Sequence, residues 1–252
     1  GLANRIIARW AVAHAVAMPK DVYGYPANKT IQVGVPISAD YQMVTAAAQA
    51  SFKKSFGLNK DSQVLLITGG GLGANRLNLT VPKIAKILLD RHPKLCILHI
   101  AGRGKDADLD QAYDKHLKTD QLQRVVVEPF VKDLYRYSGA ADVVITRASA
   151  TTLAELAAQA KACIVVPNHE LTGGHQTKNA DVLSKQKAIV SLSDKSLQKN
   201  PELLLREIER LLADPKARLE LARNLHNTSD QDSAQKLTQL LINVAEGKGL
   251  VK

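Results

Sequence analysis

The chain is short of aromatic residues and cysteine, and it lacks any long apolar run. Only 4% of its 252 residues are aromatic, and these are not interleaved with basic residues, which argues against a surface that stacks single-stranded nucleic acid. Its two cysteines lie in apolar, strand-like runs, so we expect free buried thiols in a reducing compartment. No apolar run approaches the roughly 20 residues that span a bilayer. Charges interrupt the first 18 residues, which is unlike a signal peptide.

The composition is otherwise that of an ordinary globular protein with an excess of positive charge. Apolar residues make up 45% of the chain and charged residues 23%, and the length is sufficient to bury a sizeable core. The net charge of +10 favours an anionic partner: a nucleotide diphosphate, acidic lipid headgroups or nucleic acid. Charge alone does not choose among these three.

Short apolar runs alternate with helical segments through most of the chain. This alternation is typical of a parallel sheet covered on both faces, so we expect a Rossmann-like α/β fold with a ligand edge after its strands. Pro82 is expected in the first turn of a helix that continues through Leu89. We expect strands at residues 14–18, 32–35, 64–68, 96–101, 125–130, 143–146, 163–166 and 188–192, and helices at 1–13, at 41–56 and from Pro201 onward.

Residues 142–180 organise the chain as a strand, a turn, a helix, a second strand and a polar loop. A strand that leads into a helix N-terminus presents unpaired backbone N–H groups to an anion. Glu155 lies in this helix, which we expect over residues 152–161. Thr152 and Glu155 have the spacing of a capping box, in which the carboxylate only bonds a free N–H of the helix. The alternative is a carboxylate that accepts hydrogen bonds from two ribose hydroxyls.

Five motifs together resemble the MurG family of bacterial transferases. That family moves N-acetylglucosamine from UDP onto undecaprenyl-pyrophosphoryl-N-acetylmuramyl-pentapeptide. The motifs are GLANRIIARWA at 1–11, TGGGLGANRLN at 68–78, EPFVKDL at 128–134, RASATTLAELAAQAKACIVVP at 147–167 and HQTKNA at 175–180. The resemblance covers nearly the whole chain and favours the ribose role for Glu155. It implies the donor half of a two-domain GT-B glycosyltransferase, an inverting hexosyltransferase of peptidoglycan synthesis.

The resemblance also implies a set of donor-binding residues. The backbone of Val131 would read the uracil edge, and Gln176 would bond sugar hydroxyls. Arg147 is expected either to pair with a phosphate or to brace its turn. The N–H and hydroxyl groups at the start of the central helix would bind the phosphates. Alternatively, these hydroxyls only cap the helix. The expected substrate-binding residues are Gly71, Val131, Arg147, Ala150, Thr151, Thr152, Glu155, His175 and Gln176, with Gly70, Gly73, Asn78 and Asn179 in support.

The glycine-rich segment 69–74 leaves a second ligand class open. It follows an expected strand and matches the G-x-G-x-x-A pattern of dinucleotide-binding proteins, so NAD is a rival ligand. Against NAD, the next strand ends at Gly102 and Arg103 without the acid that would hold a ribose. Alternatively, the glycines let the backbone approach a diphosphate or sugar, or form only a tight turn.

The sequence departs from the family at two positions, and it carries two acidic pairs. Ser38 stands where the family has an arginine near the phosphates, and Gly71 where it usually has serine. Arg76 or Arg103 is a candidate to replace the lost phosphate contact. We read Asp-x-Asp at 106–108 and 230–232 as solvated surface acids, and the resemblance implies no metal or other cofactor for donor binding.

The resemblance sets the expected domains and partners. Residues 1–38 would be the tail of an acceptor domain with the interdomain link, 39–230 the donor domain, and 231–252 a helix that packs back on the acceptor domain. No catalytic residue is expected in the chain, because the family's proposed base lies in an N-terminal loop. We therefore expect donor binding without turnover by this chain alone.

The same likeness predicts where the protein works. It would sit peripherally on the cytoplasmic face of the bacterial plasma membrane, with an undecaprenyl-linked acceptor held by the other domain and no nucleic acid. Apolar residues near the N-terminus would favour a homodimer. The open alternatives are a UDP-sugar or NAD-binding module and a related glycolipid-forming transferase.

Overall fold

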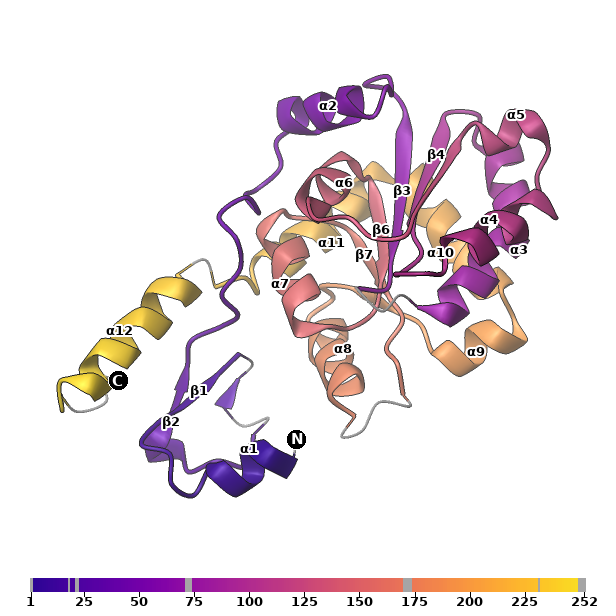
Figure 1. Cartoon of the computed structure of the whole chain (residues 1–252). Coiled ribbons are helices and arrows are strands. Elements are labelled where there is room, and N and C mark those ends of the chain that lie inside the picture. Colours follow the sequence, from indigo (N-terminus) through magenta and orange to yellow (C-terminus); the bar gives the residue numbers. More distant parts are fainter. Residues whose placement is uncertain are drawn as a thin grey trace.

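The computed structural model describes residues 2–17, 19–20, 23–70, 74–169, 174–230 and 232–248. Its centre is a six-stranded, wholly parallel sheet in the order β5-β4-β3-β6-β7-β8 (Figure 1). This order is that of doubly wound nucleotide-binding sheets, and it confirms the expected Rossmann-like α/β class. The strands are β3 Gln63–Thr68, β4 Leu95–Ile100, β5 Val125–Glu128, β6 Val143–Thr146, β7 Cys163–Val165 and β8 Val190–Ser191.

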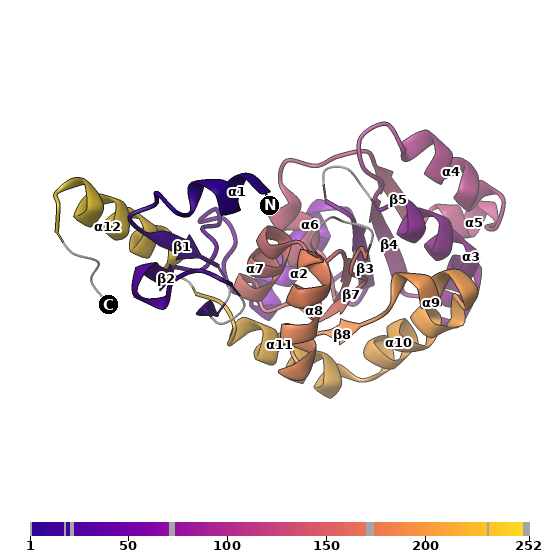
Figure 2. The same ribbon diagram turned by 90° about the horizontal axis from the view of Figure 1, so that it is seen from below.

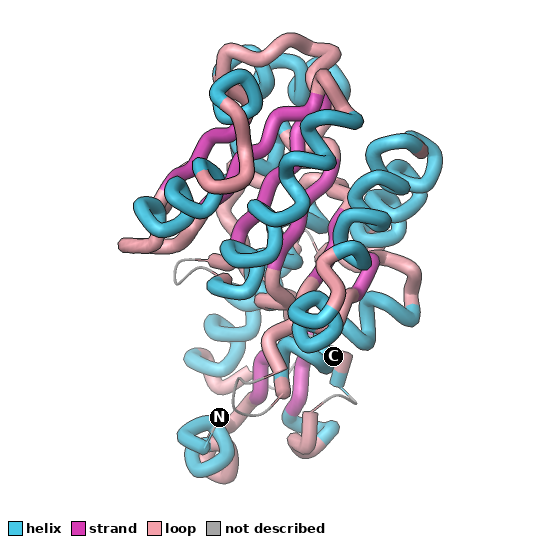
Figure 3. Tube along the Cα trace, turned by 90° about the vertical axis from the view of Figure 1, so that its right-hand side faces the viewer, coloured by secondary structure: helices cyan, strands magenta, loops and turns pink. Residues whose placement is uncertain are grey.

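Helices cover both faces of the sheet (Figure 3). Successive residues of a strand point to opposite faces, so β3 sends Leu65 and Ile67 into one core cluster and Val64 and Leu66 into the other. The first cluster packs under α3 Asn75–Arg91, α4 Asp106–Asp114, α9 Asp194–Lys199 and α10 Glu202–Ala213, and the second under α6 Leu134–Ala140, α7 Ala150–Ala158, α8 His175–Lys185 and α11 Pro215–His226.

The first thirty residues and the last helix stand apart from this sheet (Figures 1 and 2). Helix α1 Leu2–Ile7 precedes a two-stranded parallel sheet of β1 His14–Val16 and β2 Thr30–Gln32, with the short 3-10 turn η2 Ala27–Lys29 before β2. Helix α12 Ser233–Ala245 lies beside these elements. Gly34 and Ser233 pack so closely that a Cβ at position 34 would clash with the Ser233 hydroxyl. The chain therefore passes between the two parts along two adjacent segments.

Several expected boundaries were wrong, each for a local reason. Helix α2 Ala46–Ser55 begins five residues later than expected, because the Thr45 hydroxyl accepts from the Ala48 N–H and caps it there. Pro82 lies inside α3 rather than in its first turn, since that helix already begins at Asn75. Strand β2 begins two residues and ends three residues earlier than the expected strand at 32–35. Helix α1 is shorter than the helix expected at 1–13. The short α5 Thr119–Leu122 was not expected.

Two negative observations apply to the described ranges given above. Within them, no helix combines the length and apolar character needed to cross a bilayer, and no cluster of three or more His, Cys, Asp or Glu side chains is suited to a metal ion. Cys96 and Cys163 are free, and burial raises the pKa of the Cys163 thiol to about 12.

Candidate functional site

The candidate site lies at the carboxyl edge of the sheet, where its topology reverses. Strands β3 and β6 are neighbours, but the chain leaves β3 toward β4 and leaves β6 toward β7. Helices α3 and α7 begin just after these two strands and pack into opposite core clusters. Such a switch point leaves a crevice between two helix N-termini, which suits a bound phosphate group.

Glu155 is not a helix cap. Helix α7 begins at Ala150 with Ser149 as its N-cap residue, so Glu155 is the sixth helical residue, beyond the free N–H groups of the first turn. Its side chain is half-buried, and burial raises the pKa of the carboxyl to about 6, while a hydrogen bond with the Tyr41 hydroxyl opposes that rise. The capping-box interpretation was therefore wrong, because it placed the N-cap at Thr152, three residues after Ser149.

Arg147 braces its turn from within the protein. The guanidinium is buried, and its Nη1 atom donates to the Val166 carbonyl at 3.0 Å and to Asp194 Oδ1 at 2.9 Å. These bonds join the turn before α7 to the end of β7 and the start of α9. Of the two roles expected for Arg147, its contacts are those of the brace.

Asn78 belongs to a buried polar chain behind the glycine-rich segment. Its Nδ2 atom donates to the Ala101 carbonyl at 2.9 Å, so its Oδ1 atom accepts from His99 Nε2 at 3.1 Å. His99 Nδ1 then accepts from the Tyr113 hydroxyl at 2.8 Å. Burial lowers the pKa of His99 to about 3, which keeps the ring neutral. The chain joins α3, β4 and α4 beside the expected ligand edge.

The polar residues after β7 contact the start of α7 and their own loop. Asn179 Nδ2 donates to the Ala148 carbonyl at 3.1 Å, which ties α8 to the turn before α7. Gln176 Oε1 accepts from the Asn168 backbone N–H at 2.9 Å, and His175 is exposed as the first residue of α8. Both asparagines expected in support thus bind backbone carbonyls next to the edge.

The remaining expected residues lie around the same edge. Val131 follows β5 and packs against the cluster that contains Ala148 and Leu153. In α7, Thr151 is exposed and Thr152 is buried. Gly70 adopts a φ of +77°, a conformation that favours glycine. Gly71 and Gly73 lie outside the described residues, so their expected roles have no structural account.

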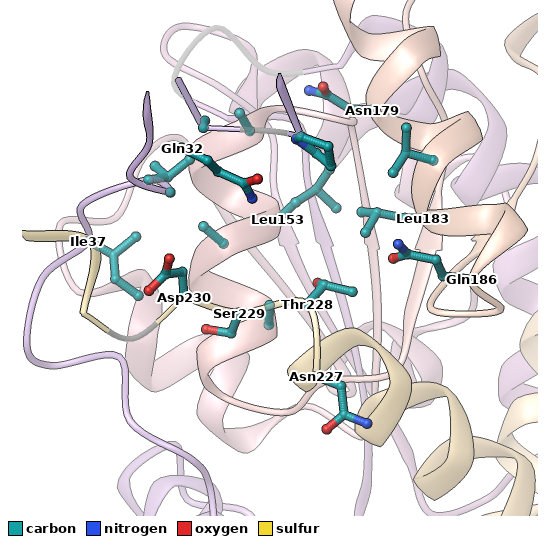
Figure 4. A pocket seen from close by; sticks show the side chains of 18 of the residues that line it. Gln32, Ile37, Leu153, Asn179, Leu183, Gln186, Asn227, Thr228, Ser229 and Asp230 are labelled. Carbon is teal, nitrogen blue, oxygen red and sulfur yellow. The ribbon is translucent and has the colours of Figure 1, made fainter. Parts of the chain in front are cut away.

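A cavity lined by described residues lies beside this edge (Figure 4). It holds about 440 Å³ between the 32–37 segment, one face of α7, α8 and the 227–230 segment. Ala150 and Asn179 line it, and among its described lining residues only Asp230 is charged, and it is paired with Lys236 at 2.6 Å. A lining without a cation does not suit a diphosphate, so we place the candidate anion site at the sheet edge and not in this cavity.

Sequence reasoning missed three side chains near the site: His99, Tyr113 and Asp194. His99 was hidden in an apolar strand pattern, and Tyr113 is the only aromatic residue of α4. Asp194 is 47 residues from Arg147, and no local pattern links such a pair. The one available signal was an acid directly after Ser193, a pair of residue types that is common at helix starts.

Comparison with known proteins identifies the family of the sheet domain. The model of the glycosyltransferase family 28 C-terminal domain matches residues 64–237. A UDP-N-acetylglucosamine–N-acetylmuramyl-(pentapeptide) pyrophosphoryl-undecaprenol N-acetylglucosamine transferase from Thermodesulfovibrio yellowstonii is 31% identical over 88% of this chain and 58% of its own length. The transferase of the same name from Xanthomonas axonopodis pv. citri is 31% identical over 97% of this chain and 53% of its own length. The chain thus spans less than two thirds of these relatives.

Solved structures share the fold at lower identity. MurG of Acinetobacter baumannii superposes with a TM-score of 0.73 at 24% identity, over 96% of this chain and 63% of that protein. The S. aureus MnaA–UDP complex gives 0.67 at 13% identity, with the same coverage. WaaG, a glycosyltransferase of lipopolysaccharide biosynthesis, gives 0.63 at 13% identity, over 91% of this chain and 61% of its own. At these identities the likeness establishes the fold alone.

Proposed function

Because the chain belongs to glycosyltransferase family 28, whose C-terminal domain it contains, we propose that it is the donor-binding part of a hexosyltransferase of peptidoglycan synthesis. The donor is UDP-N-acetylglucosamine, and the acceptor is the undecaprenyl-pyrophosphoryl-linked N-acetylmuramyl-pentapeptide named in its relatives. One observation carries the proposal: Glu155 is a half-buried carboxylate that caps no helix, and it belongs to α7, the helix that begins after β6 at the switch point.

Each part of the donor has a matching group at this edge. The Glu155 carboxylate accepts hydrogen bonds from the ribose hydroxyls, and the Val131 backbone pairs with uracil. The free N–H groups of α7 at Ala150 to Thr152 bind the diphosphate, with the helix dipole favouring its charge. Gln176 and His175 face the sugar from α8. We propose residues 39–230 as this donor domain.

The reaction inverts the configuration at the anomeric carbon. The acceptor 4-hydroxyl attacks C1, a base removes its proton, and the bond from C1 to the UDP oxygen breaks. The part played by this chain is to orient the donor and to stabilise the negative charge on the leaving UDP with the start of α7. In this proposal the base comes from outside this chain, so the chain by itself binds donor without transferring sugar.

The lipid-linked acceptor named in the same relatives supports a setting at a membrane. The protein acts peripherally at the cytoplasmic face of the plasma membrane, where the acceptor's lipid is anchored. The first 38 residues and α12 belong to the acceptor side of the enzyme, and their exposed apolar residues support a homodimer of this chain.

Calorimetric titration with UDP-N-acetylglucosamine and NAD tests the proposal. We expect a saturable heat with the UDP-sugar and none with NAD, because β4 is not followed by an acid that would hold the NAD ribose. A parallel titration at two salt concentrations tests single-stranded nucleic acid, another anionic partner that the net charge favours, because affinity for nucleic acid falls steeply with salt. Binding of NAD in preference to the UDP-sugar would contradict the proposal.

A further inference from the structure

One buried carboxylate holds two arginines that come from different sides of the switch point. Asp194, the first residue of α9, is 3% exposed. Its Oδ1 atom accepts from Arg147 Nη1 at 2.9 Å, and its Oδ2 atom pairs with Arg76 Nε at 3.1 Å. Both oxygens are thus engaged, each by a different element of the sheet edge.

One arginine lies just before one of the two helices that face the crevice, and the second arginine lies in the first turn of the other helix. Arg147 immediately follows β6, three residues before α7 begins, and Arg76 is the second residue of α3, after the glycine-rich segment. Asp194 therefore links the starts of α3 and α7 through side chains. Arg76 also reaches Gln198 Oε1 on α9 at 3.5 Å.

The geometry points to Asp194 as a positioning residue of the donor site, which fixes the starts of α3 and α7 relative to each other so that one diphosphate meets both. A diphosphate has two charged groups, and binding both at once requires two donors at a set spacing. The ribose and uracil contacts at Glu155 and Val131 do not depend on that spacing. This inference rests on the proposed function, and it assigns Asp194 to the diphosphate part of the donor.

The test compares UDP with uridine, measured by calorimetry or ligand-detected NMR on the full chain. In Asp194→Asn we expect UDP affinity to fall more than tenfold, while uridine affinity stays within twofold of wild type. The matched control is Asp142→Asn. Asp142 is a second largely buried carboxylate, paired with Lys53 at 2.9 Å, but it lies at the amino end of β6. Its replacement lowers stability similarly and should leave both affinities unchanged.

A second pair of variants serves if Asp194→Asn does not fold. Arg76→Gln removes the ion pair between Arg76 and Asp194, and the Arg76 side chain is 30% exposed. The matched control is Arg91→Gln at the other end of α3, where Arg91 pairs with Glu209 at 2.8 Å. We expect a several-fold loss of UDP affinity in the first variant and none in the second.

Unchanged UDP binding in Asp194→Asn or Arg76→Gln, or an equal loss of uridine binding, would overturn the inference. If the wild-type protein binds neither uridine nor UDP, the proposed function itself is overturned, and this inference with it.

Discussion

At the scale of single residues, Glu155 carries a half-buried carboxyl group whose ionisation opposes the stability of the fold. Burial raises the pKa of its carboxyl from 4.5 to about 6, so the unfolded chain loses this proton more readily than the folded protein. The stabilising contribution of the protonated group is complete below pH 4.5 and is lost as the pH rises through about 6. At neutral pH the ionised carboxylate therefore destabilises the unliganded protein.

We predict that Glu155→Gln raises the melting temperature of the unliganded protein at pH 7.5. The gain is at most about 1 kcal/mol, because the carboxyl is partly solvated and screened, which corresponds to about 2–4 °C in Tm for a chain of this size. The gain should vanish at pH 4.5. Scanning calorimetry at both pH values measures it, with the exposed Glu220→Gln as control. A lower Tm for Glu155→Gln at pH 7.5 would refute this account of Glu155.

The same ionisation predicts how donor binding depends on pH. In the proposed site the carboxylate accepts hydrogen bonds from two ribose hydroxyls in its ionised form, so the affinity for the UDP-sugar should fall about tenfold between pH 7.5 and pH 5 for a pKa of about 6. Titrations at several pH values measure this. UDP-N-acetylglucosamine is the suitable ligand, since its phosphodiester groups do not titrate in that range. A flat profile would remove Glu155 from the ribose site.

At the scale of elements, the packing of α2 on α6 depends on one glycine. The ring of Phe52 on α2 covers Gly139 of α6, and a Cβ built at position 139 would lie 2.5 Å from Phe52 Cδ2. Alanine normally favours a helix over glycine by about 1 kcal/mol. Here overpacking of about 1–3 kcal/mol opposes that gain.

We therefore predict that Gly139→Ala destabilises the protein by about 1–2 kcal/mol. Chemical denaturation of Gly139→Ala, Phe52→Leu and the double variant measures the effect and its coupling. The alanine should cost less in the Phe52→Leu background, because the smaller side chain leaves room for the methyl group. A Gly139→Ala protein as stable as wild type would show that Phe52 does not limit this position.

The sequence predicted the strands of the central sheet better than the boundaries of the helices. The six strands of the sheet were expected from their apolar runs, because strands buried on both faces tolerate little else. The start of α2 was misplaced because a single hydroxyl, that of Thr45, sets it. Pro82 was expected in a first turn because proline lacks an N–H, but the buried face of α3 keeps it inside the helix.

The candidate site was predictable only where it is local in sequence. Glu155 and the turn before α7 lie in one motif, whereas the partner of Arg147 lies 47 residues away. The two roles open for Arg147 could not be separated without that partner. For Glu155 the motif gave both interpretations, and only the true start of α7 at Ala150 excluded the cap.

At the scale of the whole molecule, the chain has one well-buried sheet domain and a smaller part with little core. Few residues of the first thirty are buried, and large apolar side chains are exposed there and on α12: Ile6 46%, Ile7 61%, Trp10 67%, Val12 62%, Leu241 62% and Ile242 44%. Surfaces of this kind favour association.

We predict that the chain forms a homodimer, and light scattering measures its mass in solution. The double variant Trp10→Ser with Ile7→Ser should shift the equilibrium toward monomer. A wild-type monomer at high concentration would contradict that prediction.

The most direct test of the account is a titration of UDP-N-acetylglucosamine into wild-type protein and into Glu155→Ala at pH 7.5. Because Glu155 is half-buried in the helix that begins at the switch point and caps no helix, we predict that the wild type binds the donor and that the variant loses at least tenfold in affinity while its fold is retained. Equal donor affinity in the two proteins would contradict the ribose role of Glu155 and, with it, the donor site proposed at this edge of the sheet.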